Sequence, residues 1–443
     1  MKPDGNNVYA IMLPNRSHCA YTHVGNKLKK TRTMKKTKLL FLSIISFLLI
    51  SANKPNQTFD FRIRTITAGI TLENLDDLNS INKAITFLEK AKKIYINNGY
   101  EVQDIRISTQ NLHELVTDKP TEHTIKRLKA IDKILVQNSI SLSVGELISG
   151  NQYDEKLAEW AVELIKETSN INFSVPISSE SLGIHHKTIK TASEICIALS
   201  KNSKGGEANF RFTASANCPD GIPFFPAAYH KGKNSFAIGL EYPNLITKVF
   251  EKSDWENAEV NLKNELNKQF KPIEILGQTL QTSDWNYDGI DTSPAPGLDA
   301  SIGQAIETLT GKPFGSPTTL SACSIITKVI KNLDVKSCGY SGLMLPIIED
   351  MVLAKRAMED NYTVEELLLF SSVSGTGLDV IPVAGDISKE TIEGIYRDVA
   401  SLSIKYFNKA LSARLFPIPG KNAGDIIDFD NPYLTSSVIM KLN

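Results

Sequence analysis

The sequence predicts a single α/β domain, spanning residues 59–443, that is built on strands joined by crossover helices. Segments rich in β-branched residues alternate with segments whose apolar residues recur at helical spacing. Such alternation, at roughly 20–40 residues per unit, implies parallel strands in a doubly wound sheet or a barrel. Of the 443 residues, 42% are hydrophobic and 22% are charged. This composition excludes a mostly disordered, collagen-like or coiled-coil chain.

The first half of the domain shows the alternation most clearly. Residues 62–70 (RIRTITAGI) form a predicted strand, and residues 80–97 have the apolar spacing of one helix face, with Gly99 at the carboxyl-terminal cap. Thr121 is well placed to cap a later helix. The further predicted elements are strands at 101–108, 141–144, 171–175 and 209–214 and helices at 121–137, 154–167 and 187–200.

The second half keeps the alternation but contains more glycine and proline. The most linker-like stretch, residues 201–207 (KNSKGGE), is short enough to be a loop, and no tandem repeat is found. One large domain is therefore favoured. The predicted helices of this half are 244–271, 299–308, 344–359, 364–371 and 387–405.

The charge is balanced overall, with 49 basic and 49 acidic residues, but it is unevenly distributed. Residues 1–58 hold ten Lys and Arg residues and one acidic residue, Asp4. The remainder is therefore mildly acidic and offers no basic face of the kind that binds nucleic acid.

The amino-terminal region has the pattern of a targeting signal. A lysine cluster precedes an unbroken apolar run at 39–50 (LLFLSIISFLLI), which Ser51 and Ala52 follow. A basic start, a run of 12 apolar residues and small residues behind it are typical of a secretory signal peptide. A membrane-spanning helix needs about 20 apolar residues, so this run is short for one.

We therefore predict a signal peptide at residues 34–52 and an exported, periplasmic or secreted protein. An uncleaved signal that anchors the protein to the membrane, and a cytoplasmic protein, are the alternatives. Residues 1–33 are interpreted as a wrongly assigned start or a disordered leader, because a signal peptide seldom follows a polar leader.

The cysteines do not predict a disulfide framework or a zinc site. No pair has C-x-x-C spacing, and four cysteines in a domain of this length favour buried free thiols. These four are Cys196, Cys218, Cys323 and Cys338.

Candidate site residues are sought in loops, because ligands of parallel α/β sheets bind beyond the carboxyl ends of the strands. Five loops are dense in glycine, proline and charge, at residues 212–230, 287–298, 338–350, 373–386 and 412–425. In the first loop, His230 is a candidate general base, with a packed loop as the alternative. In the second, Asp291 precedes a Pro-x-Pro turn and is a candidate functional carboxylate, with ordinary turn chemistry as the alternative.

The last two loops carry the candidate substrate-binding residues. Gly375 and Gly377 belong to a short turn that could present backbone N–H groups to an anion, and Asp379 follows it. Arg414 and Lys421 are the residue types that hold a carboxylate or phosphate, with surface charge as the alternative. In the loop at 338–350, Cys338 would need a base and a lowered pKa to act as a nucleophile.

Several known motifs are absent from the sequence. There is no H-E-x-x-H, G-x-S-x-G, calcium-loop, P-loop or dinucleotide-binding pattern. The adjacent His185 and His186 point to different sides of an element, so one metal rarely binds both. No metal site is predicted and the cofactor stays unknown, although a pair of acids near Arg or Lys could also bind Mg²⁺.

Seven segments of the chain carry a family resemblance. They are RTITAGI (64–70), GYEVQDIRIST (99–109), FFPAAYH (224–230), GIDTSPAPGLDASI (289–302), CGYSGLMLP (338–346), SGTGLDVIPVAGD (374–386) and LSARLFPIPGKNAGD (411–425). In this order they resemble the protein family known as domain of unknown function 711, from about residue 60 to the end.

The resemblance implies a fold more than an activity. The family is similar in architecture to the pyruvate formate-lyase-like fold, a ten-stranded α/β barrel. The glycyl-radical motif of those distant relatives, Arg-Val-x-Gly-Tyr, and their paired cysteines are absent here. The family's glycine turn usually reads Cys-Gly-Thr-Gly-Leu-Asp, and Ser374 stands in place of that cysteine.

The sequence thus predicts an α/β barrel with an enzyme site for a small anionic metabolite at its mouth. Asp291 and Asp379 would be acid/base or metal carboxylates, His230 a proton carrier, and Arg414 and Lys421 the anion-binding residues. A non-catalytic small-molecule binding protein of the cell envelope is the alternative, and an exported structural protein is a third. The expected partner is a small anionic molecule and not nucleic acid, membrane contact is expected only through an uncleaved signal, and a homo-oligomer is left open.

Overall fold

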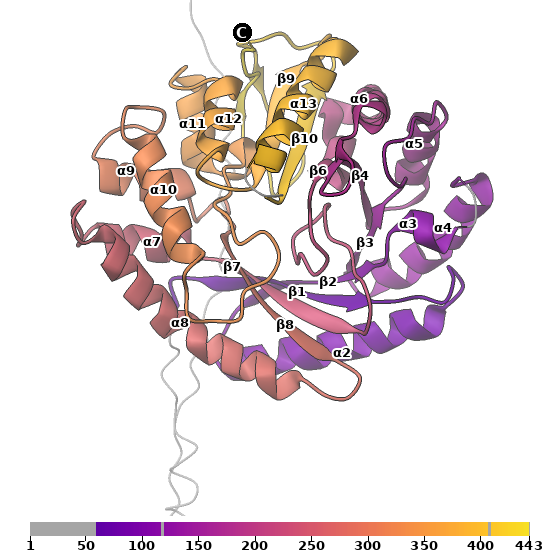
Figure 1. The fold of residues 1–443 in the computed structure, drawn as a ribbon, viewed down its shortest axis with the longest axis horizontal. Coiled ribbons are helices and arrows are strands. Elements are labelled where there is room, and N and C mark those ends of the chain that lie inside the picture. Colours follow the sequence, from indigo (N-terminus) through magenta and orange to yellow (C-terminus); the bar gives the residue numbers. More distant parts are fainter. Residues whose placement is uncertain (1–58, 117–118, 406–408, 443) are drawn as a thin grey trace, which may run out of the picture. The chain divides into compact units, whose positions relative to one another are not determined.

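The computed structural model describes residues 59–116, 119–405 and 409–442, which form one large sheet with helices around it (Figure 1). The sheet has ten strands. Nine of them follow the order β8-β7-β1-β2-β3-β4-β6-β10-β9, and β5 pairs with β4. The predicted signal peptide and leader lie outside the described residues.

Five neighbouring strands of this sheet are parallel to one another. They are β1 (Arg62–Ile70), β2 (Val102–Thr109), β3 (Ser141–Glu146), β4 (Ile171–Ser179) and β6 (Phe212–Ala216). The elements that connect them are α2 (Leu78–Asn97), α3 (Leu112–Leu115), α4 (Glu122–Gln137), α5 (Leu157–Glu167), β5 (Gly183–Ile184), α6 (His186–Lys201) and the 3-10 helix η1 (Lys204–Arg211). The alternation predicted for this half is confirmed, including a capping box at Thr121 that begins α4.

The other four long strands run in the opposite direction. β7 (Ser235–Glu241) is antiparallel to β1 and parallel to β8 (Asn286–Pro294). β10 (Leu411–Ile418) is antiparallel to β6 and parallel to β9 (Gly377–Ala384). The remaining elements of this half are α7 (Pro243–Phe250), α8 (Ala258–Leu280), α9 (Ile302–Thr310), α10 (Thr319–Ile330), η2 (Ile347–Glu349), α11 (Met351–Met358), α12 (Val364–Ser371), α13 (Lys389–Lys405), β11 (Ile426–Ile427) and β12 (Ser437–Val438).

The two ends of the strand order, β8 and β9, are not paired with each other in the sheet. The segment 337–346 makes isolated parallel bridges to both of them. Ser337 bridges to Ile290 of β8, and Pro346 bridges to Asp379 of β9. This segment therefore lies between the two edges.

Four sequence predictions for the second half are wrong. The helix predicted at 244–271 is two helices, α7 and α8, because the Asp254 side chain accepts from the backbone N–H groups of Glu256 and Asn257 in a turn between them. The helix predicted at 344–359 begins only at Met351, after the bridged segment and η2. The stretches predicted as loops at 287–298 and 373–386 are largely strands β8 and β9, respectively.

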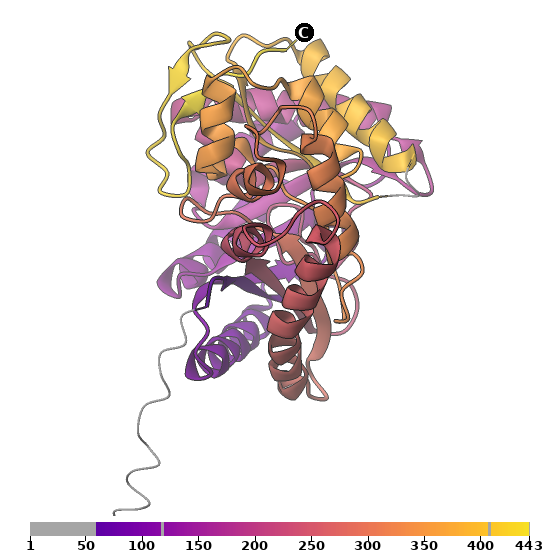
Figure 2. The same ribbon diagram turned by 90° about the vertical axis from the view of Figure 1, so that its left-hand side faces the viewer.

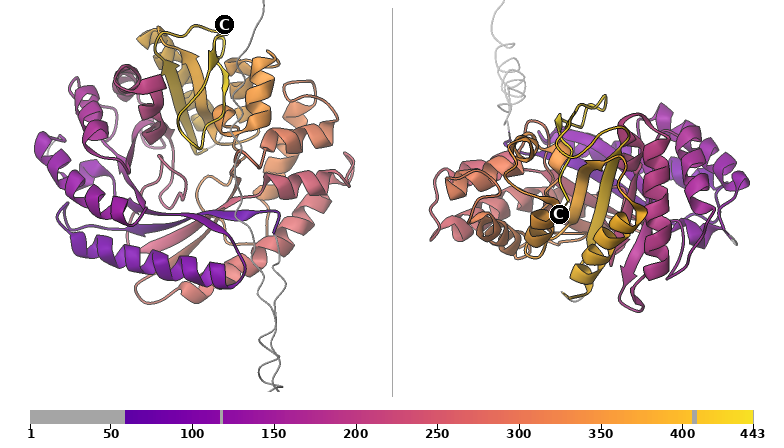
Figure 3. Two further views of the ribbon diagram at one scale, coloured as in Figure 1. Left: turned by 180° about the vertical axis from the view of Figure 1, so that it is seen from behind. Right: turned by 90° about the horizontal axis from the view of Figure 1, so that it is seen from above.

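The two faces of the sheet differ in polarity. On β2, Ile105 and Ile107 face the helices and belong to the main apolar core, whereas Asp104 and Arg106 face the other way. The helices lie around the outside of the sheet (Figures 1 and 3), and α2 and α8 cover the same side of it (Figure 2). The inner face is thus left for loops and for a cavity.

Hydroxyl groups of the inner face hold the loop that follows β6. Thr67 donates to the carbonyl of Pro223 at 2.8 Å, and Ser143 donates to the carbonyls of Ala228 at 2.6 Å and Pro226 at 3.1 Å. Buried carbonyl groups need hydrogen-bond donors, and these small polar residues of the strands supply them. The loop can therefore pack against the inner face of the sheet. In the part of the chain that the structure describes, no helix is both long and apolar enough to cross a membrane.

Candidate functional site

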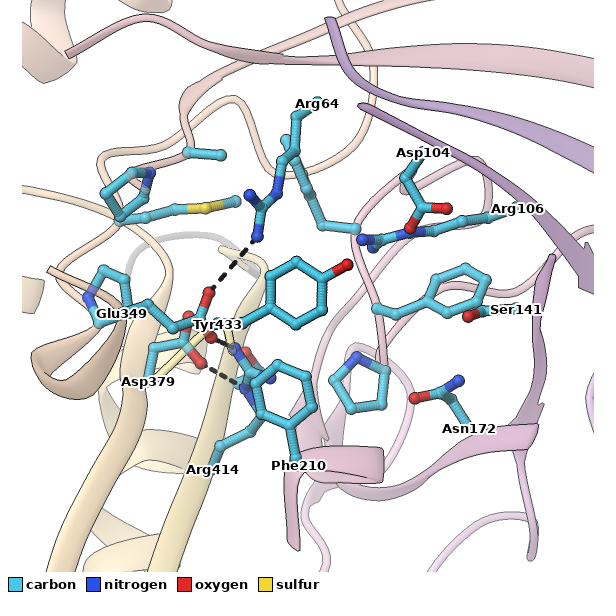
Figure 4. A pocket seen from close by; sticks show the side chains of 18 of the residues that line it. Arg64, Asp104, Arg106, Ser141, Asn172, Phe210, Glu349, Asp379, Arg414 and Tyr433 are labelled. Atoms are coloured by element: carbon cyan, nitrogen blue, oxygen red, sulfur yellow. Dashed lines mark hydrogen bonds and ion pairs between the residues drawn. The ribbon is translucent and has the colours of Figure 1, made fainter. Parts of the chain in front are cut away.

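A cavity of about 510 Å³ lies on the inner side of the sheet, beside the amino-terminal ends of β1 to β4 (Figure 4). Its charged lining consists of Arg64, Asp104, Arg106, Glu349, Asp379 and Arg414. Its apolar lining includes five aromatic rings, those of Phe210, Phe224, Phe225, Tyr340 and Tyr433. A volume of this size suits a small metabolite.

Breaks in strand register aim three of the charged side chains into the cavity. In β1, Ile63 pairs with Leu240 and Thr65 pairs with Gly239, so Arg64 lies at a bulge. In β9, Asp379 and Val380 together oppose the single residue Arg414 of β10. Bulges of this kind re-aim side chains next to active sites.

Val380 is in a strained backbone conformation at this bulge. Its φ is +46°, a left-handed value that a β-branched residue rarely adopts. The side chain is fully buried, so packing holds it there. Strain of this kind costs on the order of 1–3 kcal/mol and gathers at functional sites.

Arg414 joins the two carboxylates of the cavity. Its Nε donates to Asp379 and its Nη2 donates to Glu349 Oε1 at 2.9 Å. Burial alone would lower the pKa of this guanidinium, but the two carboxylates raise it above its ordinary value. Arg414 therefore stays charged and fixes both acids in place.

Glu349 lies between two arginines in the cavity. Its other oxygen, Oε2, is 3.9 Å from Arg64 Nη2. Burial raises the pKa of Glu349 and the nearby Asp379 carboxylate adds to the rise, while Arg414 and Arg64 act against it. The net direction is upward, so Glu349 holds a proton more readily than an exposed glutamate does.

Each of the three arginines pairs with a carboxylate and also lies over an aromatic ring. The ring centroids are 5.7 Å from Arg64 for Tyr433, 5.1 Å from Arg106 for Phe225 and 5.2 Å from Arg414 for Phe210. Arg106 Nε donates to Asp104 at 2.8 Å, and Arg64 Nη1 donates to Glu241 at 3.0 Å. Ring contact and ion pair together restrict each guanidinium to one orientation.

Of the residues proposed from sequence, Asp379 and Arg414 meet in this cavity. Gly375 and Gly377 flank Thr376, which lines it. A Cβ at Gly377 would lie 2.1 Å from the Ser412 carbonyl, and its φ is +93°. A Cβ at Gly375 would lie 3.2 Å from Gly342 Cα. Both glycines thus permit close backbone packing, and their anion-binding role stays a prediction.

Asp291 lies outside the cavity lining and is fully buried. It accepts from the backbone N–H groups of Ser293 at 3.0 Å, Tyr340 at 2.8 Å and Ser341 at 2.9 Å. Burial raises its pKa, against these hydrogen bonds. The carboxylate therefore holds the segment that carries Tyr340 against β8.

His230 and Lys421 also lie away from the cavity lining. His230 is buried, its Nε2 lies 3.3 Å from the Gly232 carbonyl, and burial lowers its pKa. Lys421 is exposed beyond the end of β10, where Nζ donates to the carbonyl of Ile426 at 3.1 Å. The roles assigned to these two residues stay predictions.

Sequence reasoning missed several residues that line the cavity, above all Arg64, Arg106, Glu349 and Tyr433. It searched the loops after the carboxyl ends of strands, and Arg64 and Arg106 lie within strands. Their signal was charged residues inside predicted strands, Arg62 and Arg64 in β1 and Asp104 and Arg106 in β2. Tyr433 comes from the carboxyl-terminal segment, which no pattern connected to β1.

The described residues contain no group of three or more His, Cys, Asp or Glu side chains that could hold a metal ion. The four cysteines in the described part of the chain are unpaired. Cys196 and Cys323 are buried, whereas Cys218 and Cys338 are half-buried. Burial raises the pKa of Cys338, which leaves its thiol protonated.

Comparison with known proteins gives a consistent result. The family model described as Uncharacterised ACR (DUF711) matches residues 56–431. The chain is 24% identical to a UPF0210 protein of Carboxydothermus hydrogenoformans, over 89% of this chain and 94% of the relative. It is 25% identical to a UPF0210 protein of Acetivibrio thermocellus, over 90% and 95%, respectively. The family resemblance noted in the sequence is thereby confirmed, and the chain belongs to the DUF711 (UPF0210) family.

Proposed function

We propose that the protein is an enzyme that acts on a small anionic metabolite in the cavity, by proton transfer from Glu349 and to Asp379. One observation carries this proposal: two carboxylates share the buried Arg414 at the wall of a cavity of metabolite size. Two acids in different surroundings are the usual arrangement for general acid and general base.

In this proposal Glu349 is the proton donor. Burial raises its pKa, which favours the protonated form that a general acid needs. Asp379, held by Arg414 Nε, accepts a proton from the substrate. Arg414 is a positioning residue, because its donors are already directed at these two acids.

The test is loss of a substrate from a metabolite mixture. We expect the wild-type protein to consume one anionic compound, measured by mass spectrometry, and Glu349→Gln and Asp379→Asn to lower the rate by about 100-fold or more. Arg397→Gln is the control, since Arg397 pairs with Glu393 on α13, outside the cavity lining.

Recovery of a bound compound in unchanged form would indicate a small-molecule binding protein instead of an enzyme. Equal rates in the wild-type, Glu349→Gln and Asp379→Asn proteins would contradict the assigned roles.

We also propose that the nine strands from β8 to β9 close into a ten-stranded barrel of the pyruvate formate-lyase-like type, with segment 337–346 as the tenth strand and β5 outside the ring. Support comes from Cys338 N, which donates to Ile290 at 3.1 Å, and Leu343 N, which donates to Ser374 at 3.3 Å. Slow hydrogen exchange at both amides is expected, and fast exchange at both would contradict closure.

Export is a further proposal, supported by the lysine cluster and the apolar run at 39–50. Cell fractionation with amino-terminal sequencing of the mature protein tests it. Full-length protein found only in the cytoplasm would refute it.

A further inference from the structure

The three arginines of the cavity differ in how many of their donors are already used. Arg414 directs Nε and Nη2 at Asp379 and Glu349. Arg64 directs Nη1 at Gln103 (2.9 Å) and Glu241 (3.0 Å). Arg106 is bonded through Nε alone, and its Nη1 and Nη2 have no acceptor among the residues that the structure describes.

Arg106 is nevertheless held firmly. Asp104 lies two residues earlier on the same face of β2 and accepts from Arg106 Nε. The Phe225 ring lies under the guanidinium at 5.1 Å, and only 16% of the side chain is exposed. A guanidinium fixed by Nε presents its Nη1–Nη2 edge, the edge that binds a carboxylate or phosphate with two parallel hydrogen bonds.

The surroundings of that edge are suited to an anion. Figure 4 shows the Arg106 guanidinium extending into the pocket. Ser141 is the direct partner of Arg106 in the parallel β2–β3 register and also lines the cavity. Its hydroxyl can donate a further hydrogen bond. Asp104 is already bonded to Arg106 and to the backbone N–H of Ile105 at 2.9 Å.

Arg106 and the two acids lie on opposite sides of the cavity. Figure 4 shows Glu349, Asp379 and Arg414 on one side and Arg106, Ser141 and Asn172 on the other. Phe210, Phe225 and Tyr433 also line the cavity. A ligand that reaches both sides therefore passes along aromatic rings.

We propose that Arg106 binds a carboxylate or phosphate group of the ligand, at the end remote from the groups that face Glu349 and Asp379. The ligand class is an anion with an apolar or planar middle. This inference rests on the proposed small-molecule function of the cavity and adds to it the position of the anionic group.

The experiment measures binding of simple anions by calorimetry. The probes are inorganic phosphate, acetate and phenylacetate, each titrated into the full-length wild-type protein, Arg106→Gln, Arg106→Lys and Arg397→Gln. Phenylacetate should bind more tightly than acetate, because its ring reaches the aromatic lining. Arg106→Gln should weaken phosphate and phenylacetate by about 10- to 100-fold, the loss of a charged hydrogen-bond pair.

The affinity of Arg106→Lys for the probes should lie between those of the wild-type and Arg106→Gln proteins, since lysine keeps the charge and loses the planar edge. Arg397→Gln should bind like the wild-type protein. Melting temperatures of all variants show whether a weakened variant is still folded.

Two results would overturn the inference. One is equal binding of the probes to wild-type and folded Arg106→Gln protein. The other is no binding of any probe to the wild-type protein. Glu349→Gln separates this inference from the proposed function, because it should keep probe binding while losing turnover. Turnover that survives in Glu349→Gln would refute the proton-donor role proposed for Glu349 and leave Arg106 as an anion site.

Discussion

Glu349 and Asp350 are neighbours in the chain, and the structure gives them opposite surroundings. Asp350 is fully buried and accepts from Ser301 Oγ at 2.6 Å and from four backbone N–H groups. Those N–H groups belong to Ile302, Gly303, Val352 and Leu353, at the starts of α9 and α11. Glu349 instead faces a cavity and is bonded by Arg414.

The same contrast separates Asp291 from Asp379. Asp291 is bonded by backbone N–H groups and by the Ser293 hydroxyl at 2.6 Å. Asp379 is bonded by Arg414 at a bulge that lines the cavity. Burial alone therefore does not identify a functional carboxylate, since it raises the pKa of Asp291, Asp350 and Glu349 alike.

The partner is what distinguishes the two kinds of carboxylate. Backbone N–H groups are fixed by the fold, and a carboxylate that binds several of them stabilises a loop or a helix end. A guanidinium in a cavity can also face a ligand. The comparison predicts that Asp350 and Asp291 matter for stability, and that Glu349 and Asp379 matter for activity.

The largest effect is expected for Asp350→Ala. Helix α11 loses its cap, worth roughly 0.5–2 kcal/mol, and the first two N–H groups of α9, which begins at its own cap Ser301, are left without this acceptor. We expect the free energy of unfolding in urea to fall by about 3–4 kcal/mol. Asp430→Ala, which removes an exposed ion pair with Lys204, is the control and should change it by less than about 0.5 kcal/mol. A similar small change for Asp350→Ala would refute the comparison.

Much of the first half of the fold could be predicted from sequence. Helix α2 repeats apolar residues at helical spacing, and β1 matches the predicted strand residue for residue. In the second half the signal was weaker. β8 contains Gly289 and Pro294 and has the composition of a turn, yet pairing with β7 makes it a strand. Tertiary pairing of this kind overrides local propensity.

Less of the candidate site could be predicted. Asp379 and Arg414 were identified as charged residues beside a glycine turn and a proline turn, and they do meet. Asp291 has equally suggestive neighbours in sequence, but its partners Tyr340 and Ser341 come from a segment about fifty residues away. The bulges that aim Arg64 and Asp379 inward depend on strand register, which no single sequence shows.

Glu146 offers a further test of the comparison, and its substitution should change the stability by an intermediate amount. The Ser215 hydroxyl lies 3.4 Å from its carboxyl group, and neither a guanidinium nor a backbone N–H is bonded to that group among the described residues. Burial raises its pKa from 4.5 to about 7. The folded state therefore binds the proton more tightly than the unfolded state, and stability falls as the pH rises from 4.5 to 7.

Glu146→Gln should remove that loss, because glutamine does not titrate. Between pH 5 and pH 8, we expect the wild-type protein to lose about 1–3 kcal/mol more than the variant, measured by urea denaturation. Glu180→Gln, at an exposed glutamate just beyond β4, is the control and should keep the wild-type slope. An unchanged slope in Glu146→Gln would show that Glu146 is ionised without cost.

The smallest effect on stability is expected for Glu349→Gln, within about 1 kcal/mol, because glutamine keeps the shape and an acceptor for Arg414. Burial raises the pKa of Glu349, so wild-type stability falls as the pH rises through that pKa, and the variant should gain on the wild-type protein with rising pH. Glu307→Gln should instead lose stability relative to the wild-type protein as the pH rises. Burial would raise the pKa of Glu307, but hydrogen bonds from Arg356 and from the Phe314 N–H lower it. Urea denaturation at several pH values checks both variants. If the stability of both variants relative to the wild-type protein changed in the same direction with pH, the two carboxylates would be equivalent. Glu349, like Glu307, would then serve the fold rather than the cavity.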